Sequence, residues 1–136
     1  MSALSKMFLI IESLILFGPA LMFAGVGLAL IPSVLGMVLQ GVLLLPALIV
    51  LVELFSLAGL YSCFQLVQKR LEPTVEIPKP KVILVYITLG YIAAIFLILL
   101  GQFYTASWQL YVLSAPSIGA VHLVYLNRSY LFGNDS

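Results

Sequence analysis

Charged side chains are scarce in this chain: Asp, Glu, Lys and Arg occupy 8% of its 136 positions, and hydrophobic residues occupy 63%. A water-soluble domain needs more polar surface than this, so the composition argues against a soluble globular protein. A net charge of +1 gives no reason to expect nucleic acid as a partner. The sequence therefore predicts an integral membrane protein whose solvent is membrane lipid.

Residues that commonly carry chemistry are also few, because Cys63 and His122 are the single cysteine and the single histidine. One cysteine cannot form an internal disulfide, and no metal-binding spacing surrounds it. The sequence contains no hydrolase elbow, phosphate-binding loop or zinc motif. We therefore predict a non-enzymatic protein that uses no cofactor and no metal.

Long apolar runs predict an all-α membrane domain with four transmembrane helices, at about residues 7–31, 42–67, 82–100 and 108–126. The first run starts like a signal peptide, but its length and the interruption at Glu12 predict an uncleaved helix. The path of residues 32–46 stays open at this stage. Because residues 36–67 would measure about 48 Å as one straight helix, against a hydrocarbon core of about 30 Å, a bend is expected at Pro46.

The one long polar break, residues 68–81, reads QKRLEPTVEIPKPK and carries three prolines. It predicts an extended, solvated loop that joins two helical hairpins. Together with Lys6 before the first run and Arg128 in the tail 127–136, it holds every Lys and Arg of the chain. Four crossings place all of these cations on one side, which the positive-inside rule identifies as the cytoplasm.

Both termini are therefore expected inside, in a multi-pass protein of a plasma (inner) membrane. An alternative with three crossings between residues 7 and 68 would put the basic loop on the opposite side from Lys6. The charge bias disfavours that alternative.

Two acids, Glu12 and Glu53, interrupt the apolar runs. A charged side chain at mid-helix costs about 2.5–3.5 kcal/mol by insertion scales, so each acid is expected to face protein or water. Glu53 lies near the middle of its helix, where we expect a protonated carboxyl that donates a hydrogen bond to a neighbouring helix. It could equally bind an ion or proton, or anchor a polar group of another protein.

Glu12 and His122 are predicted to lie at the same depth, because each is six residues inside a flanking cation, Lys6 or Arg128. They can touch if the first and last helices are neighbours. The contact would act either as a protonatable pair that couples pH or a cation to movement, or as a link that holds two helices together.

Small residues mark faces where helices can approach closely in lipid. Beside Glu53 they form a stripe of Ser56, Gly59 and Cys63. The first helix has two such faces, nearly opposite each other, and so is expected to have neighbours on both sides: one face is Ser13, Ala20, Ala24 and Gly27, and the other is Gly18, Gly25 and Ala29. In the last helix, Trp108, Tyr111, Ala115, Gly119 and His122 share a face that either packs against a helix or lines a cleft.

These features favour a small protein that binds another membrane protein through its helices, as a subunit, a regulator or an immunity-type protein that blocks a membrane toxin. The partner could also be a second copy of the chain. The candidate partner- or ion-binding residues are Glu53, Ser56, Gly59, Cys63, Glu12 and His122. The alternative is a small oligomeric transporter or channel that couples to protons or a cation through Glu53 and Glu12.

Overall fold

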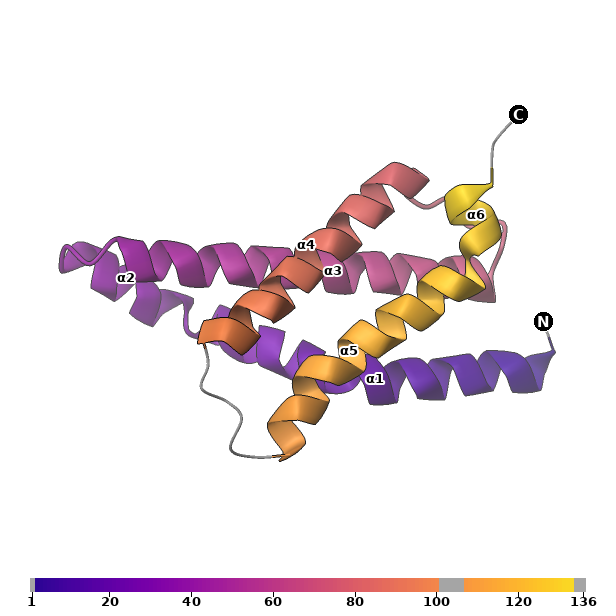
Figure 1. The fold of residues 1–136 in the computed structure, drawn as a ribbon, viewed down its shortest axis with the longest axis horizontal. Helices are drawn as coiled ribbons and strands as arrows, with labels where there is room; N and C mark the ends of the chain where they lie inside the picture. Colours follow the sequence, from indigo (N-terminus) through magenta and orange to yellow (C-terminus); the bar gives the residue numbers. More distant parts are fainter. Residues whose placement is uncertain (1, 101–106, 134–136) are drawn as a thin grey trace.

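The computed structural model describes residues 2–100 and 107–133, and every regular element in those ranges is an α-helix (Figure 1). Most of the predicted turn at residues 101–107 lies outside the described residues. The elements are α1 (Ala3–Ala29), α2 (Ile31–Leu39), α3 (Leu44–Leu71), α4 (Pro80–Leu100), α5 (Ser107–Leu126) and α6 (Arg128–Phe132).

Three helical stretches are long and apolar enough to cross a membrane: Ala3–Leu39, Leu44–Leu71 and Pro80–Leu99. A shorter apolar helix, Ser114–Leu126, lies within α5. The all-α class is therefore confirmed, and the helices suit the predicted membrane location. The fourth crossing stays a prediction.

The first two predicted helices are separated by a turn that sequence reasoning did not locate. α1 is followed by the short helix α2, and the chain then reverses through Gly41, whose φ of 85° suits a residue without a Cβ. Pro46 lies in the first turn of α3, where its missing N–H breaks no helical hydrogen bond. The expected bend at Pro46 is thus wrong: the chain turns just before it.

The polar loop is shorter than predicted, since only residues 72–79 are non-helical. It is also tied down. The Lys69 Nζ donates hydrogen bonds of 2.7 and 3.0 Å to two of its carbonyls and lies 5.4 Å from the centre of the Tyr130 ring. The Tyr130 hydroxyl in turn donates to the Pro78 carbonyl at 2.7 Å. The loop is therefore held at the end of the helices through its backbone, while most of its side chains are exposed, Glu72, Pro73, Thr74, Glu76 and Lys79 among them.

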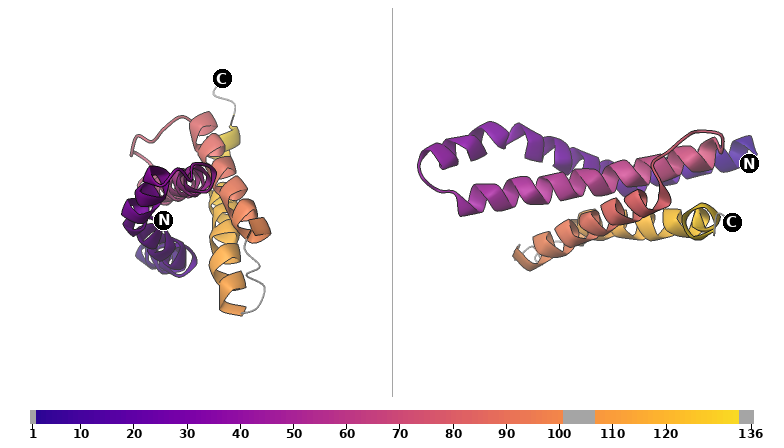
Figure 2. Two further views of the ribbon diagram at one scale, coloured as in Figure 1. Left: turned by 90° about the vertical axis from the view of Figure 1, so that its left-hand side faces the viewer. Right: turned by 90° about the horizontal axis from the view of Figure 1, so that it is seen from above.

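The helices pack around α3, which contacts α1, α2, α4 and α5 (Figure 2). Its contact with α4 is the most extensive, and it is closest where Gly59 faces Gly90. A Cβ added at Gly59 would lie 2.7 Å from the Gly90 Cα, so the two backbones meet without side chains between them. The buried core lies beside this crossing: Leu9, Phe17, Cys63, Leu66, Ile83, Ile87, Ala120, Leu123 and Leu131.

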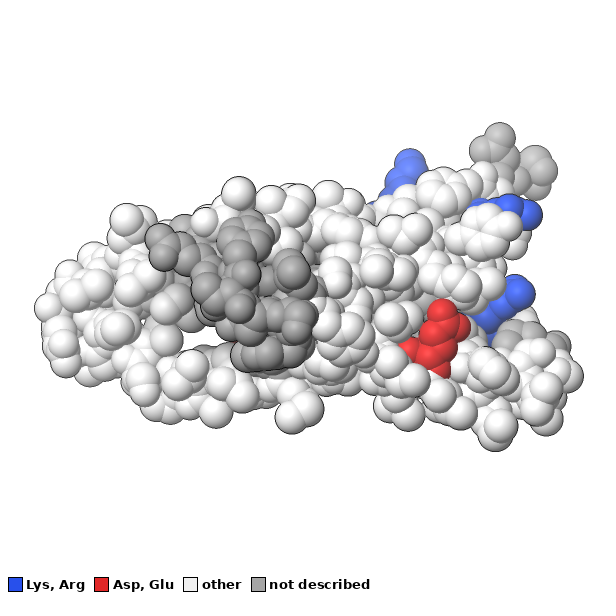
Figure 3. All heavy atoms as spheres, turned by 60° about the horizontal axis from the view of Figure 1, so that its bottom comes forward, with Lys and Arg blue, Asp and Glu red and all other residues white. Residues whose placement is uncertain are grey.

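The chain alternates in direction, so that its polar segments meet at one end. The N-terminus, the end of α3, the start of α4 and α6 all lie toward the same end of the molecule (Figure 1). On the face drawn in Figure 3, the basic side chains gather at that end. This is the arrangement that two consecutive hairpins produce.

Candidate functional site

The face of α5 that carries Tyr111 and His122 packs against α1. The Tyr111 hydroxyl donates a 2.8 Å hydrogen bond to the Ile15 carbonyl, and a Cβ at Gly119 would lie 2.8 Å from the tip of the Phe17 ring. The side chain of Trp108 lies outside the described part of the structure. Of the two alternatives for this face, the described residues show packing rather than a cleft.

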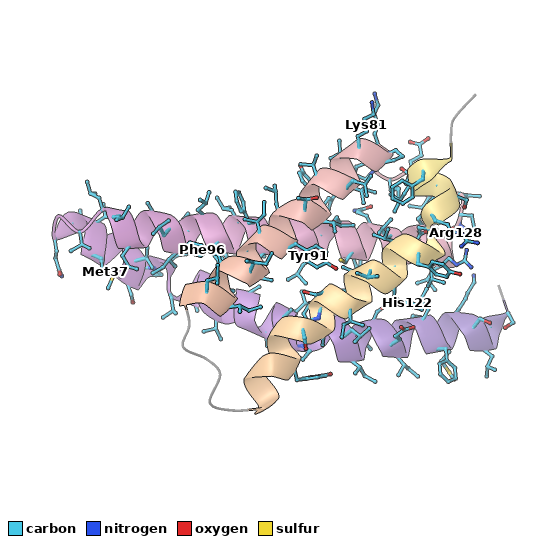
Figure 4. The ribbon with its side chains drawn as sticks, in the orientation of Figure 1. Met37, Lys81, Tyr91, Phe96, His122 and Arg128 are labelled. Carbon is cyan, nitrogen blue, oxygen red and sulfur yellow. The ribbon has the colours of Figure 1, made fainter. Side chains whose placement is uncertain are left out.

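Glu12 and His122 are brought together by this packing. The Glu12 Oε1 lies 3.5 Å from the His122 Nε2, and the two side chains are 39% and 45% exposed. Figure 4 shows His122 on the side of α5 that faces α1. The contact expected from equal depth is therefore present. The distance is long for a hydrogen bond, but it permits ion pairing whenever the imidazole is protonated.

Glu53 lies between α3 and α1, with its carboxyl group against the backbone of Gly27. A Cβ at Gly27 would overlap the carboxyl group, so a larger residue there would require the end of the Glu53 side chain to move. Glu53 Oε1 is buried and, among the described residues, has no hydrogen-bond partner. An unpaired buried polar atom costs about 1–3 kcal/mol, so this oxygen would gain from any donor or cation that reached it.

The predicted stripe beside Glu53 is largely occupied by the chain itself. Gly59 meets Gly90 of α4, and Cys63 lies in the core at 5% exposure. Ser56 is half-buried. Glu53 thus contacts α1 while Gly59 contacts α4, and the structure does not gather them on one open surface.

The two small-residue faces of α1 have different surroundings. On the first face, Ala24 is buried and Gly27 meets Glu53. On the opposite face, a Cβ at Gly18 or Gly25 would find no atom of the described residues within 4 Å, and Ala29 is exposed. One face therefore serves the chain's own packing and the other is open.

Sequence reasoning missed two polar residues that link helices inside the protein. Asn127 is 5% exposed and donates from Nδ2 to the carbonyls of Leu66 at 3.3 Å and Leu123 at 2.9 Å, which joins α3 to the end of α5. The Tyr91 hydroxyl donates to the Ser117 carbonyl at 2.6 Å, which joins α4 to α5. A polar side chain at the edge of an apolar run was the available signal for Asn127.

Arg70 was also missed as a site residue. It shares an open cavity of about 360 Å³ with Glu12, between α1, the end of α3 and the end of α5. The remaining walls are Leu4, Ser5, Phe8, Leu9 and Leu126. The cavity is thus mostly apolar and carries one side chain of each charge.

Among the described residues, no group of three or more His, Cys, Asp or Glu side chains could hold a metal ion. A search with protein-family models finds no match to this chain, and comparisons with curated proteins and with solved structures find none either.

Proposed function

We propose that the chain is a small non-enzymatic protein of a plasma (inner) membrane that binds a helix of another membrane protein. It would act as a subunit, a regulator or an immunity-type protein. The observation that carries this proposal is the open face of α1, where no described residue comes within 4 Å of a Cβ position at Gly18 or Gly25.

The open face has the features of a helix-packing surface. In lipid no hydrophobic effect drives helices together, so association depends on close packing at small residues. Leu21 and Met22 lie between the two glycines and are 56% and 75% exposed, so they can pack on either side of an approaching helix. Within the chain, α3 and α4 already pack closely at small residues in this way, at Gly59 and Gly90.

The proposed orientation has four crossings with both termini in the cytoplasm. Its support is the distribution of charge, since every Lys and Arg lies in the N-terminal segment, the loop region 68–81 or the tail. As the fourth crossing, α5 has 20 residues, or about 30 Å of helix, which matches a hydrocarbon core.

Co-purification with matched variants tests this proposal. The tagged protein is extracted from its native membrane in mild detergent, and the proteins recovered with it are quantified. Gly25→Leu should reduce recovery of a specific membrane protein at least tenfold, because the side chain would hold the partner helix away. Gly36→Leu is the control, since a Cβ there also meets no atom within 4 Å.

Equal recovery with both variants, or equal loss with both, would rule out binding through the α1 face. A differently tagged second copy, expressed together with the first, separates a homo-oligomer from a complex with another protein.

One observation favours a second candidate function, a small proton- or cation-coupled transporter or channel. The buried, unpaired Oε1 of Glu53 is an acceptor that a proton or cation could occupy. Purified protein in liposomes would then carry a proton or cation flux that Glu53→Gln abolishes. Passive liposomes would exclude this candidate and leave the first.

A further inference from the structure

The cavity shared by Glu12 and Arg70 carries opposite charges that form no ion pair with each other among the described residues. Both side chains line it, yet the ion pair that Glu12 makes in the described structure is with His122. Arg70 has no hydrogen bond or ion pair among the described residues. An acceptor-only carboxylate and a donor-only guanidinium therefore face one space without a bond between them.

The position of the cavity restricts what can fill it. It lies at the end of the molecule that carries the basic residues, where lipid headgroups meet acyl chains in the proposed orientation. Its apolar walls include Leu4, Phe8 and Leu126, which suit the upper part of an acyl chain. A ligand matching all the walls has an apolar body, an anion for Arg70 and a cation for Glu12.

We infer that this cavity binds one phospholipid with a zwitterionic, primary-amine headgroup from the leaflet that faces the cytoplasm. The phosphate accepts hydrogen bonds from the Arg70 guanidinium, which can bind two oxygens at once. The ammonium donates to the Glu12 carboxylate. This inference rests on the membrane location proposed above, but not on the partner proposed for α1.

The charges on the walls select among headgroups. A choline headgroup has the same net charge, but its quaternary nitrogen has no N–H to donate to Glu12. An anionic glycerol headgroup would satisfy Arg70 and could donate a hydroxyl to Glu12, but it brings no cation to pair with the carboxylate and leaves the site with one excess negative charge. Phosphatidylethanolamine alone of these three gives each side chain a hydrogen-bonded partner of opposite charge.

Native mass spectrometry of delipidated protein measures the selection. The protein in detergent is given equal amounts of phosphatidylethanolamine, phosphatidylcholine and phosphatidylglycerol with identical acyl chains. We expect one retained phosphatidylethanolamine, at least fivefold over each competitor.

Four variants test the assignment. Arg70→Gln and Glu12→Gln should each remove the preference. Lys6→Gln should keep the preference for phosphatidylethanolamine. This substitution also removes one positive charge from the same end of the molecule, but Lys6 does not line the cavity. His122→Gln should also keep the preference, because this substitution breaks the Glu12–His122 pair and leaves the Glu12 carboxylate in place. This variant separates loss of the site from loss of α1–α5 packing.

Three results would overturn the inference: equal retention of all three lipids, a preference for phosphatidylglycerol that depends on Arg70 but not on Glu12, and a preference that survives both cavity variants. None of them bears on the Gly25→Leu co-purification, so the lipid site and the proposed partner can fail separately.

Discussion

Glu12 and His122 occupy a contact that is half open to the surroundings, and that exposure limits its strength. Pairs exposed to this degree contribute about 0.2–1 kcal/mol. The pair therefore acts together with neighbouring packing, notably Gly119 against Phe17 and the hydrogen bond from Tyr111 to Ile15. Its loss should weaken the α1–α5 contact without unfolding the protein.

A double-mutant cycle measures this contact. Glu12→Ala and His122→Ala should each lower the free energy of unfolding by a similar amount, about 0.2–1 kcal/mol. The double variant should be little worse than either single one, because the same interaction is lost. SDS-induced unfolding in micelles provides the free energies, and strictly additive losses would show that the pair is not coupled.

The contact between Glu12 and His122 could be predicted from the sequence, but the surroundings of Glu53 could not. Counting residues inward from Lys6 and Arg128 set two side chains at one level, and an even number of crossings placed them on the same side. For Glu53 the sequence showed that an acid lies in an apolar helix. It could not show that Gly27 of α1 would make room for the carboxyl group, because that depends on how α1 and α3 pack.

The contact between α3 and α4 depends on a pair of glycines that face each other. A Cβ at Gly59 or at Gly90 would lie within 3 Å of the opposite Cα. Backbone atoms cannot move aside as the end of a flexible side chain can. The short distance between α3 and α4 therefore depends on both glycines, and so does the packing of Cys63 and Ile87 beside them.

Gly59→Ala and Gly90→Ala should each destabilise the protein by about 1–3 kcal/mol, the usual cost of overpacking. Gly36→Ala is the matched control. A Cβ there meets no atom of the described part of the chain within 4 Å, so the gain in helix propensity should stabilise by about 0.5–1 kcal/mol. The measurement is SDS-induced unfolding, and a stabilising effect at Gly59 would contradict the close crossing.

The faces of the helices were harder to predict than their existence. α4 is almost uniformly apolar, so its sequence carries no periodic signal for the side that meets α3. The small residues of α1 did give such a signal, and one of its two faces packs as expected. The role of the other face stays a prediction.

All basic residues, and the elements that carry them, converge on one end of the molecule. Reporter fusions after Phe132, at the N-terminus and within residues 72–79 should therefore give cytoplasmic signals, and a fusion at Gly41 should give an external one. The physical reason is the cost of moving Lys and Arg across the bilayer. An external signal from one terminus alone would require an odd number of crossings, and external signals from both would invert the protein, so either result would contradict the proposed orientation.

Charge and hydropathy predicted the apolar helices on both sides of the polar loop, but they did not predict how that loop is held. Three prolines and six charges suggested a loop open to solvent. The structure keeps most of its side chains exposed but also fixes its backbone through Lys69 and Tyr130, whose partners are backbone carbonyls. Such partners have no sequence signature, because any residue supplies a carbonyl.

The hydrogen bond from the Tyr130 hydroxyl to the Pro78 carbonyl ties α6 to the loop between α3 and α4. Whatever pulls on α6, whether a docking protein or a fused tag, would also pull on the first turn of α4. A protein shortened at Leu126 would keep its hydrophobic passes but lose this mechanical coupling, and Lys79 and Lys81 would then become easier for trypsin to reach.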